Sequence, residues 1–335
     1  MKYLALVLST SVLVACGGGG GGGATVSLAP TPTAALNMSN QTAAAQDTTS
    51  TAFMPIWGTR ELTGAQVTDE SVLFSIARDQ LDKLPTYMAN AQANQTLTGA
   101  VQSQTSSCPL GGSLTVSVND ADNSTLLSAG DSFTIVYSNC VLNSATLSGS
   151  LGFVFNSLSG SYQSPASTNY TLGITMNYGN FTVTGSGLIA SMNGSMTFAA
   201  IANGVNTLSE TISTPSLTVS GTYGGLTRSR SLTGYSATVT KIPDVTYGYL
   251  KSYSMSGAVT SSALSAQAIS FATSTPLVLR GTDGYPSSGV MVISGANNSK
   301  IKLTALSSTQ IQQDLDANGD GSYETTSTVN WNTLL

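Results

Sequence analysis

The sequence predicts a mainly β protein, a long antiparallel meander preceded by one amphipathic helix. From about Leu97 onward, apolar and polar residues alternate with period two, as in half-buried strands. Before that, apolar residues recur at helical spacing over residues 68–84. Tight turns without helical crossovers indicate antiparallel neighbours, and so long a sheet must curl, split into a sandwich or close into a barrel. We favour a strongly curved sheet, a half-barrel, with the helix packed on its concave side.

The N-terminus has the pattern of an exported, lipid-modified protein. Lys2 gives a positive start, and an apolar run too short for a membrane span follows, as in a secretory signal peptide. The run ends in Leu13, Val14, Ala15 and Cys16, an order that resembles the lipobox of bacterial lipoproteins. This resemblance implies acylation of Cys16 by chains such as palmitate. The alternative is an ordinary signal peptide that leaves Cys16 as a spare thiol.

The residues after the lipobox have the composition of a flexible tether. Residues 17–23 are all glycine, and residues 24–51 are rich in Ala, Thr, Ser, Gln and Pro with little periodic apolar pattern. We therefore expect a signal peptide over residues 1–15, then a lipid anchor and disordered leash over residues 16–51. A single β-rich domain is expected over residues 52–335.

The residue after the lipobox Cys also indicates to which bacterial membrane the protein is anchored. Asp in that position resembles the inner-membrane retention signal of lipoproteins, whereas this chain has Gly17. The comparison implies attachment to the outer membrane of a Gram-negative cell. The body is expected to face either the periplasm or the outside, and the sequence does not distinguish the two.

The helix over residues 68–84 has a start signal, an apolar stripe and a stop signal. Thr68 is a hydroxyl N-cap, and two acidic residues follow it in the positive first turn. Pro85 predicts the end. The apolar stripe consists of Val72, Leu73, Ile76, Ala77, Leu81 and Leu84. Packing of this stripe on the protein's own sheet is favoured over binding of a partner.

The strands are joined by turn signals. Gly179-Asn180 predicts a two-residue hairpin that keeps Tyr178 and Phe181 on one apolar face. Further hairpins are predicted at Asn193-Gly194 and at Gly224-Gly225, and later strands are predicted over residues 290–293, 301–305, 311–315 and 323–331.

Two cysteines remain after Cys16 is assigned to lipid. Cys108 and Cys140 form an even pair in an oxidising compartment, so a disulfide is expected. They flank two predicted strands around residues 114–118 and 133–137, and pairing of those strands brings the cysteines together. A thiolate metal site is not expected, since the chain has no His and too few soft ligands.

An acidic segment near the C-terminus is a candidate calcium loop. Its pattern resembles the D-x-D-x-N-G-D loops of EF-hand-like proteins, with Gly319 at the sixth position. The candidate ligands are Asp314, Asp316, Asn318, Asp320 and Glu324. The segment departs from the pattern at the twelfth position, where Thr325 cannot act as a bidentate ligand. The alternative is a polar hairpin turn.

A second acidic loop fits the calcium pattern less well. Asp120, Asp122, Ser124 and Asp131 supply oxygens at positions 1, 3, 5 and 12, but Thr125 stands where glycine is expected. A structural turn is the alternative here too.

Composition excludes several classes of function. Charged residues make up 8% of the chain, against about 25% in typical soluble domains. The absence of His excludes a Ser-His-Asp arrangement, and no G-x-S-x-G, P-loop or dinucleotide motif is present. A sequence pI near 4.5 without basic clusters argues against nucleic-acid binding. No catalytic or cofactor-binding residue is therefore predicted.

These observations predict a non-enzymatic outer-membrane lipoprotein that binds or scaffolds something in the envelope. An apolar-ligand carrier needs a concave surface lined with Leu, Ile, Met and Phe. A surface adhesin or glycan binder needs exposed Tyr and Asn, and the 13 Tyr are compatible with it. An envelope protein is a further possible partner. The alternative class is an extracytoplasmic enzyme that uses carboxylates or calcium, in which two acids from separated strands would share a cleft.

Two resemblances bear on the body of the chain. Cys108, Gly111-Gly112-Ser113, the Asp120–Asp131 loop and Asn139-Cys140 together are similar to uncharacterised proteobacterial outer-membrane lipoproteins, a likeness that implies no activity. The element order resembles the half-barrel of lipoprotein carriers.

Overall fold

The computed structural model describes residues 30–57, 71–93, 101–142, 145–160, 169–185, 187–204, 207–223, 226–281 and 283–335. The helices are α1 (Gln41–Trp57) and α2 (Ser71–Ala93), and three short 3-10 helices are η1 (Ser262–Leu264), η2 (Ala296–Asn298) and η3 (Trp331–Thr333). The strands are β1 (Gln102–Ser107), β2 (Ser113–Asn119), β3 (Ser132–Leu142), β4 (Ala145–Gly160), β5 (Asn169–Gly185), β6 (Leu188–Asn203), β7 (Leu208–Tyr223), β8 (Leu226–Asp244), β9 (Gly248–Ser261), β10 (Gln267–Arg280), β11 (Ser288–Ser294), β12 (Lys300–Ala305), β13 (Gln310–Asp316) and β14 (Thr325–Asn330).

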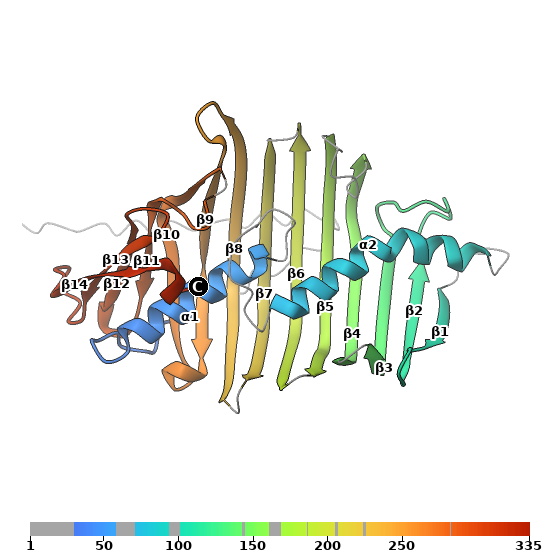
Figure 1. The fold of residues 1–335 in the computed structure, drawn as a ribbon, viewed down its shortest axis with the longest axis horizontal. Coiled ribbons are helices and arrows are strands. Elements are labelled where there is room, and N and C mark those ends of the chain that lie inside the picture. Colours follow the sequence, from blue (N-terminus) through green and yellow to red (C-terminus); the bar gives the residue numbers. More distant parts are fainter. Residues whose placement is uncertain are drawn as a thin grey trace, which may run out of the picture.

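The strands form one antiparallel meander, as the sequence predicts. Within the described residues, fourteen strands follow each other in chain order, and each pairs with its predecessor. Figure 1 shows β1 and β14 at opposite ends of the sheet, which is therefore open.

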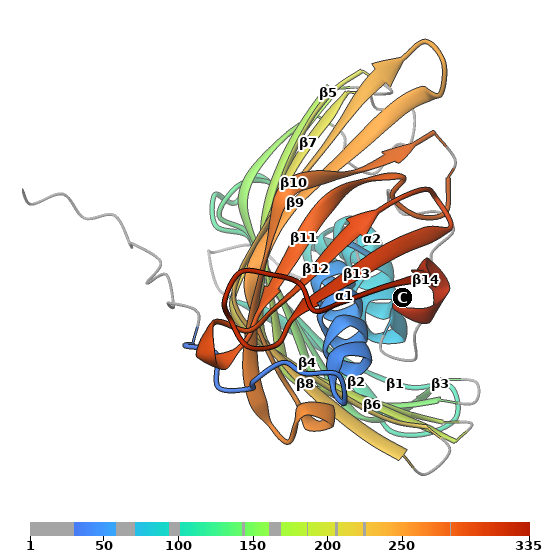
Figure 2. The same ribbon diagram turned by 90° about the vertical axis from the view of Figure 1, so that its left-hand side faces the viewer.

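The sheet is strongly curved, and both helices lie against its concave side (Figure 2). A run of inward-facing apolar side chains on nearly every strand meets the helices in one cluster of buried residues. The convex side faces solvent. The period-two pattern accounts for the single buried face, because alternate side chains of a strand point to opposite faces of the sheet.

The predicted turn at Gly179-Asn180 is wrong. Both residues lie inside β5, which continues through them to Gly185, and the pairing of β5 with β6 shifts register between Tyr178 and Phe181. Asn180 has a φ of 47°, so its left-handed conformation forms a bulge in the strand. Tyr178 and Phe181 are nevertheless both buried on the same face, because the bulge gives β5 one more residue than β6 between these two positions.

Asn193-Gly194 is likewise inside a strand, β6. At the register shift that follows, between Gly194 and Thr197, the extra residue lies on the partner strand β7. The sequence signal of a turn, a small residue that tolerates positive φ, is also the signal of a bulge. The bulges bend strands of 16 and 17 residues, which helps a sheet of such long strands to curve. Gly224-Gly225 lies outside the described residues.

The amphipathic helix is α2, and its predicted end was wrong. Of its predicted apolar stripe, Leu73, Ala77 and Leu84 are buried, and Val72, Ile76 and Leu81 are partly buried against the same core. The helix continues through Pro85 to Ala93. A proline inside a helix costs about 3 kcal/mol, and burial of side chains on both sides of it offsets that cost. The predicted start at Thr68 lies outside the described residues.

A second helix, α1, was not predicted, and it replaces part of the expected leash. Residues 41–51, assigned to a disordered tether, form most of α1, and the preceding Leu36 is buried as well. The segment has no apolar stripe, because α1 is covered on several sides and buries polar and apolar residues together. Residues 30–40 of the expected leash are described too, and the backbone N–H groups of Thr33 and Ala34 donate to the carbonyl of Ala268 on the sheet. Residues 16–29 of the leash, Cys16 among them, lie outside the described residues.

The disulfide between Cys108 and Cys140 is confirmed. Strands β2 and β3 pair with Ser113 opposite Ser138, which places the two cysteines at the open end of this hairpin with their Cα atoms 5.4 Å apart.

Candidate functional site

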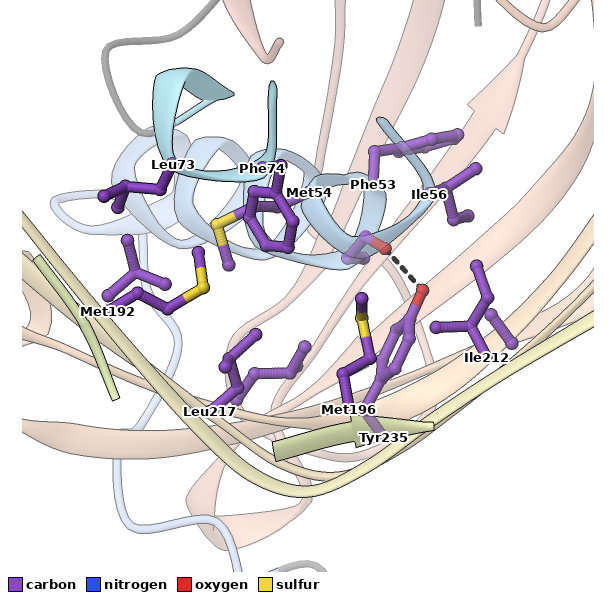
Figure 3. Packing of buried hydrophobic residues seen from close by; sticks show 14 of the residues in the cluster. Phe53, Met54, Ile56, Leu73, Phe74, Met192, Met196, Ile212, Leu217 and Tyr235 are labelled. Atoms are coloured by element: carbon purple, nitrogen blue, oxygen red, sulfur yellow. Dashed lines mark hydrogen bonds between the residues drawn. The ribbon is translucent and has the colours of Figure 1, made fainter. Parts of the chain in front are cut away.

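The concave face under α1 is lined with buried apolar side chains. Met192, Met196, Ile212 and Leu217 extend from β6 and β7 toward α1, as Figure 3 shows. Strand alternation places these residues on one face, and their bulk fills the space below the helix. The concave face is therefore lined in the way that an apolar-ligand carrier requires, but helices of the same chain occupy it.

Aromatic side chains connect α1 to this face. The Tyr235 hydroxyl donates a hydrogen bond of 2.8 Å to the backbone carbonyl of Ala52 (Figure 3). Phe53 of α1 packs edge-on against Tyr253, with ring centroids 5.7 Å apart. Burial raises the pKa of the Tyr235 hydroxyl far above its ordinary value, so it remains a neutral hydrogen-bond donor.

A buried ion pair also joins α1 to the sheet. Asp47 of α1 is 1% exposed, and its carboxylate accepts a hydrogen bond of 3.1 Å from Nε of Arg230 on β8. The Ser261 hydroxyl, from the end of β9, donates to the other carboxylate oxygen. Arg230 is 9% exposed. A charge pair this deeply buried loses most of its hydration, so each partner depends strongly on the other.

Two threonines of α1 bury hydroxyl groups without a hydrogen bond. The Oγ1 atoms of Thr48 and Thr51 are fully covered and have no partner. The Thr49 hydroxyl, between them, donates to the carbonyl of Ala45. Each unsatisfied buried hydroxyl costs about 1–3 kcal/mol. These two unsatisfied hydroxyls therefore reduce the stabilisation that α1 gains by packing against the apolar sheet.

A second set of charged side chains lies on the concave face farther along the strands. Glu210 and Lys251 are buried, and the ammonium groups of Lys241 and Lys251 lie 4.7 and 5.4 Å from the centre of the Tyr249 ring. Lys241 is 11 residues from Arg230 along β8 (241 − 230), which is about 36 Å of extended strand. The charged set around Lys241 and Lys251 is therefore far from the Asp47–Arg230 pair.

Sequence reasoning missed the Asp47–Arg230–Ser261 cluster. Asp47 lay in the segment assigned to the leash. Arg230, however, stands two positions before Leu232 and so shares its apolar face. A charged residue on the same strand face as buried apolar residues predicts a buried charge. This pattern was already present in the sequence.

The predicted C-terminal calcium loop is partly assembled. Carboxylate oxygens of Asp316, Asp320 and Glu324 lie within 4.8 Å of one another. Asp316 is buried and accepts hydrogen bonds from the backbone N–H groups of Gly319 (2.7 Å) and Gly321 (3.0 Å). Gly319 has a φ of 76°, and a Cβ there would lie 2.3 Å from the carbonyl oxygen of Asn297, so only glycine fits.

Asp314 does not join this group, which corrects the predicted ligand set. It lies inside β13, opposite Lys302 of β12, and the Lys302 ammonium is 2.9 Å from its carboxylate. Burial alone would raise the pKa of Asp314, but hydrogen bonds from Lys302, Thr326 and Gln312 together lower it. The strand places it about 7 Å along from Asp316. The fifth predicted residue, Asn318, uses its side-chain oxygen to accept the backbone N–H of Asp320.

The first acidic loop is assembled in a similar way. Asp120, Asp122 and Asp131 bring carboxylate oxygens within 4.8 Å. Asp131 is buried and accepts the backbone N–H groups of Ala121 and Ser128. Burial raises the pKa of Asp131 above its ordinary value despite these hydrogen bonds. The Ser124 hydroxyl donates to the backbone carbonyl of Leu126, and the Ser124 backbone N–H donates to Asp120 and Asp122.

The convex face is rich in hydroxyl groups and poor in charge. Hydroxyls on neighbouring strands bond to each other, as in Ser103–Ser117 (2.7 Å) and Ser191–Ser220 (2.7 Å). Glu210 is the one charged residue of the sequence between Asp131 and Arg228, and it is buried on the other face. The polar groups of the central convex face are therefore mainly hydroxyl and amide groups.

A comparison of the chain with protein-family models, with curated proteins and with solved structures found no match. Among the described residues, neither helix has both the length and the apolar character that a membrane span needs.

Proposed function

We propose that this chain is a non-enzymatic, lipid-anchored protein of the outer membrane whose curved sheet binds an apolar ligand on its concave face. The observation that carries the proposal is the broad apolar surface under α1, covered by a helix that buries polar side chains against it.

The positions of the tyrosines favour the carrier over the glycan binder. Tyr137, Tyr178, Tyr235 and Tyr253 are buried in the core, where a glycan cannot reach them. Among tyrosines with described side chains, Tyr247 and Tyr323 are the exposed ones, and the rings of both already face cationic side chains.

A neutral apolar probe tests the proposal. N-phenylnaphthylamine fluoresces in apolar surroundings, and we expect saturable binding by the intact protein. Met196→Gln, which places an amide on the concave face, should weaken binding. Val136→Gln, a matched change on the convex face, should not. Absence of saturable binding by the unaltered protein would show that the concave face is not a ligand site.

The anchor is a separate part of the proposal. Its support is the lipobox order that ends at Cys16. An alkyne-tagged fatty acid should label the intact protein in cells, and Cys16→Ser should abolish both the label and co-fractionation with membrane. Persistence of either in the variant would refute acylation at Cys16.

Calcium at the Asp316–Glu324 loop would have a structural role. Three carboxylates so close together repel one another unless a cation or water separates them. The loop connects β13 to β14, and Gly319 rests against η2, so a bound ion would tie these elements together. An affinity of about 10⁻⁴–10⁻³ M is expected, as in extracellular modules.

Thermal melts test the calcium site. We expect a higher Tm in several millimolar calcium than in chelator, because the ion binds the folded loop alone. Asp316→Ala should remove the difference. Asp314→Asn, which changes a nearby acid outside the group, should retain it. Equal melts of the unaltered protein in calcium and in chelator would make the loop an ordinary polar turn.

A further inference from the structure

We infer that the edge strand β1 is an interaction surface, and that its partner is β1 of a second copy of this chain, paired antiparallel about Gln104. The inference depends neither on a ligand of the concave face nor on the lipid anchor, so it goes beyond the proposed function. Its starting point is the open sheet, which ends in the two edge strands β1 and β14 (Figure 1).

The first observation is a row of backbone groups that β1 turns away from the sheet. The Cys108 N–H donates to the Gly112 carbonyl, next to the paired strands β1 and β2. Antiparallel strands alternate between hydrogen-bonded and non-hydrogen-bonded residue pairs, so this bond assigns the even-numbered residues of β1 to β2 and turns the backbone groups of Ser103, Thr105 and Ser107 outward. No hydrogen bond from the described part of the chain reaches these outward groups.

The second observation is that β1 lacks the features that protect natural edge strands from pairing. It has no Lys and no Pro, it pairs with β2 in one continuous register without a bulge, and five of its six residues are exposed. Natural edge strands avoid association through charged residues, Pro or bulges. Strand β1 is therefore a template for a further strand.

Charge favours a second copy as that further strand. Strands β1, β2 and β3 contain no charged residue, so two copies can meet at this end of the sheet without like charges opposite each other. The acidic loop between β2 and β3 lies at one end of β1, and antiparallel pairing places the loops of the two copies at opposite ends. Strand β14, by contrast, directly follows the exposed Glu324, a charge that protects that edge.

The third observation is a pair of exposed apolar side chains that flank β1. Val101 precedes the strand and Leu110 follows it, and each is 63% exposed. Antiparallel pairing of β1 with itself places the start of each strand beside the end of the other. Val101 of each copy then lies next to the turn that carries Leu110 of the other copy, so a two-fold pairing covers these residues reciprocally. An extended peptide of unrelated sequence would have no reason to match both.

The end of β1 is also fixed before any association. The disulfide between Cys108 and Cys140 ties the turn after β1 to β3. The Leu110 N–H donates to the Val141 carbonyl, and the Val141 N–H donates to the Gly111 carbonyl at 2.8 Å. Pairing therefore requires little ordering of this edge, which reduces the entropic cost of association.

The outward backbone groups select the register. Pairing about Gln104 places Ser103 opposite Thr105 of the second copy, and Val101 opposite Ser107 of the second copy, so that residues with outward groups face one another along the whole strand. Other registers that match the faces of the two sheets form fewer such pairs. Gln104 then faces Gln104 of the second copy, and the two concave faces open to the same side.

Cysteine cross-linking tests this register in the full chain with Cys16→Ser, so that neither acylation nor a third thiol affects the result. In Gln104→Cys the two new thiols would face each other in a non-hydrogen-bonded pair with Cα atoms about 4.5 Å apart, within the reach of a disulfide. Mild oxidation should give a covalent dimer. Ser106→Cys is the matched control, since it is exposed on the same strand face, but its two copies would lie about 13 Å apart along the strands. Equal cross-linking of the two variants, or none in Gln104→Cys, would overturn the pairing.

Proline substitutions test which edge associates. The interface is small, so we expect a roughly micromolar dissociation constant, measured by sedimentation equilibrium of the same Cys16→Ser chain. Thr105→Pro removes an outward N–H without breaking the pairing of β1 with β2, and it should weaken dimerisation at least about tenfold. Thr328→Pro is the same change on β14, at a position whose N–H also points outward because the Trp331 N–H donates to Thr309. It should leave dimerisation unchanged.

The other outcomes identify other partners and overturn the proposal. Weakening by Thr328→Pro alone would move the interface to β14. Weakening by both variants, with assemblies longer than a dimer in the chain without proline, would indicate head-to-tail pairing of β14 with β1. A monomer at all concentrations would show that β1 does not pair with itself and would leave the edge to an extended segment of another protein.

Discussion

Replacing Arg230 by methionine alone should lower the free energy of unfolding by about 3–5 kcal/mol, because it leaves the Asp47 carboxylate buried without its cation. Replacing Asp47 by leucine at the same time should recover most of that loss. The two changes are therefore strongly non-additive, and a double-mutant cycle by urea denaturation measures the coupling directly. Similar losses in the single and paired variants would mean that the two side chains do not depend on each other.

The Lys302–Asp314 pair is the matched control for this measurement. The Lys302 side chain is 31% exposed, and Thr326 and Gln312 also donate to Asp314. Lys302→Met should therefore cost only about 1 kcal/mol. The contrast between the two pairs tests whether burial of the pair under α1, and not charge pairing in general, accounts for the large effect.

Loss of the disulfide should have the next largest effect. Replacing Cys108 and Cys140 together by serine opens a loop with a sequence separation of 32 residues. The chain-entropy model predicts a loss of about 3–4 kcal/mol. The two cysteines join the start of the sheet, where β1 has exposed side chains and α2 packs nearby.

Denaturation with and without reductant measures this effect. The unaltered protein should lose stability in reductant, and the double serine variant should be insensitive to it. Cys16 must be lipidated or replaced in both proteins, so that it cannot exchange with the pair. Equal stability of the oxidised and reduced forms would contradict the prediction.

The period-two pattern was sufficient to predict the antiparallel meander, because alternation along a strand directly reports which face is buried. Leu172 and Ile174 on β5, for example, are both covered as the pattern requires. The same pattern could not separate a turn from a bulge at Asn180, since both use a residue that tolerates positive φ. That choice depends on whether the neighbouring strands continue past the position.

The candidate calcium site was likewise predicted in part from the sequence. Sequence spacing was sufficient to bring Asp316, Asp320 and Glu324 together, because all three belong to one short connection. It misassigned Asp314, whose carboxylate is held by Lys302 on the neighbouring strand. The partner of a strand residue depends on register, which local spacing does not report.

The sequence by itself determined the fold class, the amphipathic helix and the Cys108–Cys140 pairing, since each depends on local periodicity or on adjacent strands. Only the tertiary structure revealed α1 and its ion pair. A helix covered on several sides has no apolar stripe to identify it, and Asp47 and Arg230 are 183 residues apart in the chain. Figure 2 shows α1 inside the curve of the sheet, and the proposed ligand face is the concave side of that curve.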